Sequence, residues 1–183
     1  WIEDPFRLFF LWQGGLSFHG GLIGVIVSLY VFSIKQKISF LALMDSIALA
    51  MPIGLGLVRI GNFLNGELFG RPTNGEWGFI FPTDPLGIPR HPSQLYECFL
   101  EGIILFFVLN YIARQNVAKG VTASALLIFY GLFRFIVEFF RQPDMHIGLI
   151  AFDLSMGQIL SLPMMIIGLV LVVVFQRNNA TIS

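Results

Sequence analysis

The apolar stretches of this chain constrain its fold more than any other feature. A helix that crosses a bilayer needs roughly 20 residues, most of them apolar. The stretches that approach this length lie at 16–34, 40–60, 94–113, 122–140 and 157–175. Hydrophobic residues make up 56% of the chain and charged residues only 12%, which is a low share of charge for a soluble domain. The sequence therefore predicts an all-α, polytopic membrane protein with about five transmembrane helices in this chain.

Nothing in the sequence divides the chain into parts. It shows no linker, internal repeat or low-complexity tract, so we expect residues 1–183 to form a single membrane-embedded domain. The chain begins with Trp1 and shows no signal peptide, and we expect it to lack the N-terminal part of a longer protein. Residues 1–13 are too few and too charged to span, and their aromatic side chains suit the membrane interface. The only cysteine, Cys98, excludes a disulfide within this chain and is expected to pack in a helix.

Charge gives the expected orientation. Basic and acidic residues number 11 each, so net charge suggests no nucleic-acid partner. A count of basic residues on the two sides is equivocal. One side nevertheless carries every lysine and has no acid beside its basic residues, which are Lys35, Lys37, Arg114, Lys119 and Arg177. We place that side in the cytoplasm, so the loops 61–93 and 142–155 are expected to face outward.

A dense polar run stands at the end of the second apolar stretch. Residues 59–71 read RIGNFLNGELFGR, with two arginines, two asparagines, a glutamate and three glycines. An apolar helix has no need of such groups, whereas a phosphate-bearing lipid headgroup does. Guanidinium forks and amides supply the directed donors that water would otherwise provide. The run predicts a site for an anionic lipid at one face of the bilayer.

The segment that follows this run is a long loop rich in glycine and proline, and long structured loops are usually functional. Within 61–93, Trp77, Phe79 and Phe81 alternate along the chain. They are compatible with a short strand or an interfacial flap. The alternative, that they only anchor the loop among the lipid headgroups, fits the sequence at least as well.

The fourth apolar stretch carries ionisable residues on one helical face. Tyr130, Arg134, Glu138 and Arg141 follow one another at spacings of four, four and three residues. An ionisable group inside a membrane is costly and is a functional candidate by default. The alternative is an Arg134–Glu138 ion pair that only fixes helix packing, because buried pairs also serve specificity.

Histidine and carboxylate positions complete the set of candidates. His19 opens the first stretch, and its near-neutral pKa suits a general base, although a lone histidine there is more often a packing residue. Glu97 and Glu101 are four apart and either pair with arginines or are buried in protonated form. A Ser–His hydrolase built on His91 and Ser93 lacks the Gly-x-Ser-x-Gly elbow.

Two negative expectations and one structural role also follow from the sequence. Asp45 is expected to cap or pack rather than to react. The histidine, cysteine and carboxylate spacings do not suit a metal, and we predict neither metal nor cofactor.

These residues converge on one bilayer face, where an anionic phospholipid is their natural ligand. Arg59 or Arg134 would neutralise a phosphate as it becomes a leaving group. Two other readings remain open at this point. One is a small membrane transporter with Arg134 lining the pathway, and the other is a lipid-binding structural subunit.

Four ordered blocks of the chain resemble the prolipoprotein diacylglyceryl transferase family, and together they cover nearly its whole length. They are SFHGGL at 17–22, GNFLNGE at 61–67 with its flanking arginines, RHPSQLYE at 90–97 and FRFIVEFFR at 133–141. The resemblance implies transfer of the diacylglyceryl group of phosphatidylglycerol to the lipobox cysteine of a bacterial prelipoprotein. The product is a thioether, and glycerol phosphate is released.

The resemblance also implies roles for individual residues. Arg59 and Arg134 would hold the lipid headgroup and stabilise the departing phosphate, and His19 would be the base for the substrate thiol. The remaining substrate-binding positions are Asn62, Glu67, Gly70, Tyr130 and Glu138, of which the last two would orient Arg134. The implied location is the bacterial inner membrane, with the active site toward its outer face. The family's seven spans imply two further spans before Trp1.

Overall fold

The computed structural model describes residues 18–142, 149–151 and 154–182. The predicted interfacial segment 1–13 and the side chain of His19 lie outside the described residues. The chain forms two compact units, Trp1–Leu43 and Met44–Ser183, and each is described by itself. The single-domain organisation stays a prediction.

The first unit contains helix α1 (Phe18–Gln36), which matches the first predicted stretch to within two residues. The residue after the helix, Lys37, has a left-handed φ of 53°. The amide of Ile38 then donates to the carbonyl of Ser33 over 3.0 Å, which closes the helix end. Tyr30 packs edge-on against Phe40, with ring centroids 5.6 Å apart. Helix α2 (Phe40–Leu64) begins at this contact and continues into the second unit.

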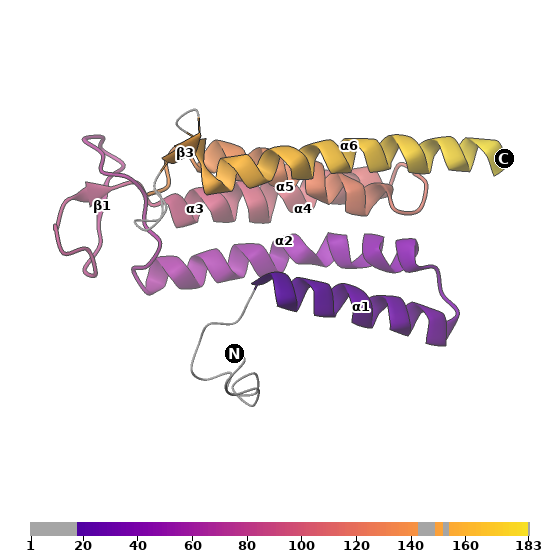
Figure 1. Cartoon of the computed structure of the whole chain (residues 1–183). Helices are drawn as coiled ribbons and strands as arrows, with labels where there is room; N and C mark the ends of the chain where they lie inside the picture. Colours follow the sequence, from indigo (N-terminus) through magenta and orange to yellow (C-terminus); the bar gives the residue numbers. More distant parts are fainter. Residues whose placement is uncertain (1–17, 143–148, 152–153, 183) are drawn as a thin grey trace. The chain divides into compact units, whose positions relative to one another are not determined.

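The second unit is a helical bundle. The third predicted stretch is one continuous helical run made of α3 (Ser93–Glu97), the π-helical segment η3 (Cys98–Ile104) and α4 (Leu105–Ala113). Helix α5 (Val121–Val137) and helix α6 (Met156–Ile182) run side by side in opposite directions (Figure 1). The short strands β3 (Leu149–Ala151) and β4 (Leu154–Ser155) precede α6. The prediction of an all-α fold is confirmed apart from short strand pairs in the connections.

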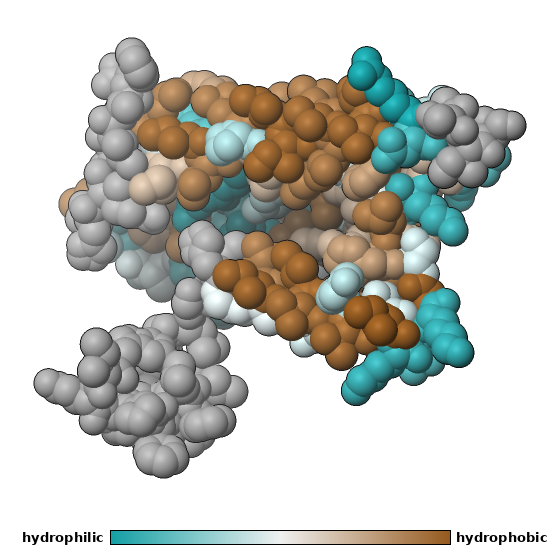
Figure 2. All heavy atoms as spheres, turned by 45° about the vertical axis from the view of Figure 1, so that its right-hand side comes forward, coloured by the Kyte–Doolittle hydropathy of each residue, from teal (hydrophilic) through white to brown (hydrophobic). Residues whose placement is uncertain are grey.

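The helices are those of a multi-pass membrane protein. Within the described part of the chain, three helices are long and apolar enough to cross a membrane: Phe40–Leu64, Ser93–Ala113 and Met156–Asn178. Two of the five predicted spans are shorter apolar helices, Gly20–Gln36 and Val121–Val137. Large hydrophobic side chains on all of these helices are exposed. In the space-filling view most of the visible surface belongs to apolar residues, and many of the hydrophilic residues gather on its right-hand side (Figure 2). Such surfaces suit contact with lipid.

Small residues allow α5 and α6 to approach closely. A Cβ atom on Gly131 would lie 2.8 Å from the Met165 side chain, and one on Gly168 would lie 2.8 Å from the Ser124 carbonyl oxygen. Close approach at small residues is typical of packing between membrane helices. On its other side α5 packs against α4, where Leu105, Leu109 and Ala125 form the buried core.

Asp45 caps a neighbouring helix, as the sequence suggested. Its carboxylate oxygens accept hydrogen bonds from the amides of Gly120, over 2.7 Å, and Ala123, over 2.8 Å, at the start of α5. These amides have no partner within their own helix. A carboxylate at a helix N-terminus also interacts favourably with the helix dipole. Asp45 therefore ties α2 to the end of α5 that lies away from Arg134.

The connection between α2 and α3 is shorter than predicted, because α2 continues to Leu64. The end of α2 is a Schellman motif, in which the Gly66 amide donates to Phe63 and the Glu67 amide donates to Asn62. Gly66 takes a φ of +67°, which a glycine adopts without strain. The block GNFLNGE at 61–67 thus forms the end of a helix, where the sequence indicated the start of a loop.

An antiparallel pair of short strands, β1 (Phe79–Ile80) and β2 (Pro89–Arg90), folds the rest of this connection. Of the three alternating aromatic residues only Phe79 lies in a strand, so the predicted strand is confirmed in part. Phe63 packs against Phe79 and Phe81, and Phe69 stacks on Phe81. The buried Arg90 donates to both carboxylate oxygens of Asp84, from Nε over 2.6 Å and from Nη2 over 3.1 Å. Its guanidinium lies 4.8 Å from the Phe69 ring centre. Hydrogen bonds from Arg90 hold the pKa of Asp84 below its usual value.

Candidate functional site

Arg59 lies one and a half turns before the end of α2, and its side chain is only 16% exposed. Its Nε atom lies 2.5 Å from Oε2 of Glu97, the last residue of α3. Its Nη2 atom lies 4.0 Å from Oε2 of Glu101 in η3. Both glutamate side chains are fully buried. The mostly buried Arg59 is therefore paired with carboxylates from a different helical run.

Arg134 reaches the same carboxylate from the last turn of α5. Its Nη1 atom donates to Glu97 Oε2 over 3.2 Å, and its Nη2 atom lies 3.2 Å from Glu138 Oε2. The sequence left open whether Arg134 forms a pair with Glu138 only. The structure contains that pair and adds a contact to a second helix. Arg141 lies three residues after Glu138, beyond the end of α5, with its Nη1 atom 4.0 Å from Glu138 Oε2.

We call Arg59, Glu97, Arg134, Glu138 and Arg141 the arginine–glutamate cluster. It draws on α2, on α3 and on the C-terminal end of α5 with the residues that follow. Glu101 lies next to this set, 4.0 Å from Arg59. With it, three guanidinium groups face three carboxylates, so the charges balance when all are ionised and an added phosphate would have to pair with the guanidinium donors. Guanidinium groups bind phosphate through paired hydrogen bonds, and charge-assisted bonds of this kind are strong. The cluster can therefore bind a phosphate-bearing ligand.

Three predicted residues lie in the run after Arg59. The Asn62 amide donates to Glu67 Oε1 over 2.8 Å. The side chain of Gln94, in α3, donates to the Glu67 carbonyl over 2.6 Å. Gly70 pairs with Arg141 in an isolated β-bridge, and a Cβ there would lie 2.5 Å from the Phe140 carbonyl oxygen. The run is thereby bonded both to α3 and to the chain beyond α5, next to the cluster.

The roles of the other two predicted residues, Tyr130 and His19, stay predictions. Tyr130 is partly buried and packs against the core formed by Leu105, Leu109 and Ala125. Its role in orienting Arg134 stays a prediction. His19 lies in α1, in the other unit, and its side chain is not among those described, so its role as a base also stays a prediction.

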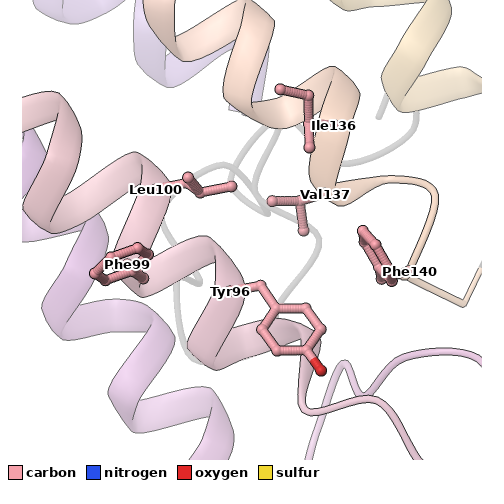
Figure 3. A pocket seen from close by; sticks show the side chains of 6 residues that line it. All are labelled: Tyr96, Phe99, Leu100, Ile136, Val137 and Phe140. Carbon is pink, nitrogen blue, oxygen red and sulfur yellow. The ribbon is translucent and has the colours of Figure 1, made fainter.

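An apolar pocket of about 350 Å³ lies between the α3–η3 run and the C-terminal end of α5, and its lining residues include the chain neighbours of Glu97 and Glu138. It is lined by Tyr96, Phe99, Leu100, Ile136, Val137 and Phe140. Leu100 and Val137 point toward one another across it (Figure 3). The Tyr96 hydroxyl points away from these two side chains and lies 3.2 Å from His91 Nδ1 (Figure 3). Since Ser93 Oγ donates to the Leu68 carbonyl, His91 and Ser93 do not form a hydrolase pair.

Two features of the site were not predicted as such. Glu97 was considered only as one possible partner for the arginines, whereas it contacts both of them. The Asp84–Arg90 pair, which organises the connection beside the site, was not predicted. The four-residue spacing of Glu97 and Glu101 was the available signal for the first. Among the described residues no group of three histidine, cysteine or carboxylate side chains could hold a metal ion.

The comparisons with known proteins agree on one family. Residues 1–174 match the family model for prolipoprotein diacylglyceryl transferase. A phosphatidylglycerol–prolipoprotein diacylglyceryl transferase of Geobacter sulfurreducens is 51% identical over 179 residues, which cover 98% of this chain and 68% of the relative. A protein of the same name from Mannheimia succiniciproducens is 50% identical over 183 residues, covering 100% of this chain and 68% of the relative.

A third relative with this name, from Aeromonas hydrophila, is 53% identical over 171 residues, covering 93% of this chain and 62% of the relative. The chain thus spans 62–68% of the length of these three relatives. All three names describe an enzyme, which favours a transferase over the transporter and the structural subunit.

Proposed function

The chain belongs to the prolipoprotein diacylglyceryl transferase family, and we propose that its arginine–glutamate cluster binds the phosphate of phosphatidylglycerol in a diacylglyceryl transfer reaction. The family resemblance carried by the four sequence blocks is confirmed by the match. One observation carries the assignment of the site. Arg59 and Arg134, on different helices, converge on a single buried carboxylate oxygen at the loop end of the bundle.

The proposed reaction joins a substrate thiol to a lipid carbon. The sulfur of the prelipoprotein's lipobox cysteine attacks the glyceryl carbon that bears the phosphate ester, and a carbon–sulfur bond forms. The carbon–oxygen bond to the phosphate breaks, and its electron pair leaves with glycerol phosphate. The thiol proton passes to a base, for which we propose His19. Because the substrate supplies the sulfur, Cys98 has no part in this chemistry.

The arginines supply electrostatic stabilisation. Negative charge grows on the phosphate oxygen as the carbon–oxygen bond breaks, and guanidinium groups fixed beside it lower the barrier. Arg59 contacts Glu97 through Nε, so its two terminal nitrogens are not used in that ion pair. Arg134 contacts the two glutamates through its terminal nitrogens, so its Nε is not used in those pairs. Both side chains retain some exposure, at 16% and 13%, through which a headgroup could reach them.

The remaining family residues support the site from its loop side. Asn62, Glu67 and Gly70 hold the connection after α2 against α3 and Arg141, and we propose that this connection forms one wall of the headgroup site. Glu138 keeps Arg134 in place. The enzyme would act in the bacterial inner membrane with this end of the bundle toward the outer face. In support, Lys119 stands before α5, at the end away from Arg134.

The experiment uses the full-length parent protein, because this chain spans only part of its relatives. The purified protein is incubated with labelled phosphatidylglycerol and a lipobox peptide, and peptide mass and released glycerol phosphate are measured. We expect a diacylglyceryl mass gain that disappears when the peptide cysteine is replaced by serine. Lipid binding by folded protein without any mass gain would contradict the proposed reaction.

A further inference from the structure

Glu97 occupies an unusual place in the cluster. One of its oxygens, Oε2, lies 2.5 Å from Arg59 Nε and accepts a hydrogen bond from Arg134 Nη1 over 3.2 Å. The side chain has no exposed area. Among the described ion pairs, it is the carboxylate that contacts both Arg59 and Arg134. It therefore joins α2 to α5 through α3.

The other carboxylates cannot take over this connection. Glu138 lies on the same helical face as Arg134, four residues on, and holds that arginine from its own chain segment. Glu101 lies 4.0 Å from Arg59, beyond hydrogen-bond distance. Without Glu97, Arg134 would keep its contact with Glu138, and Arg59 would keep only the 4.0 Å contact with Glu101. Two guanidinium groups repel one another, so the shared carboxylate is what holds them close together.

The backbone around Glu97 also fixes this geometry. Glu97 is the last α-helical residue before the π-helical segment η3, and such segments occur frequently at functional sites. In η3, Gly102 lies against Gly56 of α2, and a Cβ on Gly102 would be 2.9 Å from the Gly56 Cα. Arg59 follows Gly56 by nearly one helical turn. Backbone contact between the two helices thus brings Arg59 to the carboxylate of Glu97.

We propose that Glu97 is a positioning residue, whose shared carboxylate sets the separation of Arg59 and Arg134 so that both bind one phosphate group. It acts through the arginines and does not itself contact the substrate. This inference rests on the proposed function of the cluster. It predicts that both the charge of the side chain and its length matter, because the carboxylate has to reach two guanidinium groups from two other helices.

The test compares Glu97→Gln and Glu97→Asp in the full-length parent. Glutamine removes the charge, and aspartate keeps the charge but shortens the side chain by one methylene. Three quantities are measured for each variant. They are the affinity for phosphatidylglycerol in detergent, kcat/KM for phosphatidylglycerol, and KM for a lipobox peptide. We expect both to lose about tenfold or more in affinity and kcat/KM for the lipid. The peptide KM should stay within about twofold, because the arginines do not bind the peptide.

The matched control is Asp45→Asn, the same carboxylate-to-amide change at the other end of α5. Asp45 caps that helix, so its replacement should lower thermal stability. Its lipid affinity and kcat/KM should stay within about threefold of wild type, because the cluster is untouched. This control separates a loss of stability from a loss of positioning.

The outcomes are distinguishable. If Glu97→Gln keeps the lipid affinity and kcat/KM of the wild type, the positioning role is overturned. The proposed function still stands in that case, provided that the wild type transfers the diacylglyceryl group. Full activity in Glu97→Asp would show that only charge is needed, which also overturns it. If Glu97→Gln does not fold, Glu97→Asp carries the test. If the wild type shows no transfer and both variants bind the lipid more weakly than it does, the positioning role is supported and the proposed reaction is rejected.

Discussion

A Cβ atom on Gly157, in the first turn of α6, would lie 2.7 Å from Oε2 of Glu138. That oxygen is the one nearest to Arg134 Nη2, at 3.2 Å. The start of α6 therefore has room for the Glu138 carboxylate only because residue 157 is glycine. The fourth apolar stretch carries the ion pair, and the fifth provides the space in which it lies.

We expect Gly157→Ala to displace the Glu138 carboxylate and to lower kcat/KM for phosphatidylglycerol by about tenfold, equivalent to about 1.4 kcal/mol. The loss arises because Arg134 is no longer held from its own helix. Initial rates in mixed micelles measure it. Gly54→Ala is the control, since a Cβ on Gly54 meets no described atom within 4 Å. Equal rates for the Gly157 variant and this control would contradict the expected coupling.

Arg134→Lys distinguishes a phosphate site from a simple ion pair. Lysine keeps the charge but has no planar fork, so it cannot contact Glu97 and Glu138 as Arg134 does and still offer a donor to phosphate. We expect transfer activity to fall about a hundredfold or more, or about 2.7 kcal/mol. The protein should still fold, as judged by its elution from a sizing column and its thermal unfolding. A lysine variant with wild-type activity would favour a purely structural pair.

The glycine contact between α2 and η3 predicts an order of stabilities. A Cβ on Gly102 would meet the Gly56 Cα at 2.9 Å, whereas a Cβ on Gly56 would meet the Gly102 Cα at 3.4 Å. We expect Gly102→Ala to lower the free energy of unfolding by about 1–3 kcal/mol, because backbone cannot yield as a side chain does. Gly56→Ala should lower the free energy of unfolding by a smaller amount. Thermal unfolding in detergent gives the order, and the reverse order would show that the helices do not meet in this way.

The Asp84–Arg90 pair predicts a dependence of stability on pH. Since the pKa of Asp84 is lowered in the folded protein, the pair stabilises the fold at pH values above the usual pKa of 3.8. That contribution is lost as the pH falls through the lower, folded pKa. Asp84→Asn should therefore be less stable than wild type at pH 7, and the difference should shrink by about pH 3. Melting temperatures of both proteins at the two pH values measure this. A difference that does not change with pH would rule out the pair as its source.

The helices were predictable because their signal is local. Apolar composition alone placed the start of each predicted stretch within two residues of a helix start in the structure. The spacing of Arg134 and Glu138 placed them on one helical face and left an ion pair between them as an alternative, and the structure contains that pair. The end of α2 was misplaced because the asparagines and glycines after Arg59 looked like a loop. They instead form a Schellman motif, in which Gly66 supplies the left-handed residue.

The parts that escaped prediction depend on contacts between distant residues. Nothing in the spacing of Arg59 and Glu97, 38 positions apart, indicates that they meet, and the π-helical segment that helps to bring them together has no clear sequence signal. The C-terminal end of α5 was also not predicted. Its composition is apolar, but its helix ends at Val137, so the last residues of the fourth stretch belong to the turn that carries Glu138.

The most direct measurement of the central claim is the affinity of the full-length protein for phosphatidylglycerol with each cluster arginine replaced. Arg59→Ala and Arg134→Ala are compared with Arg114→Ala, a basic residue at the end of α4 and away from the cluster. If the cluster binds the lipid phosphate, the first two variants bind at least about tenfold more weakly and the third binds like wild type. Wild-type affinity in folded Arg59→Ala and Arg134→Ala would contradict the account.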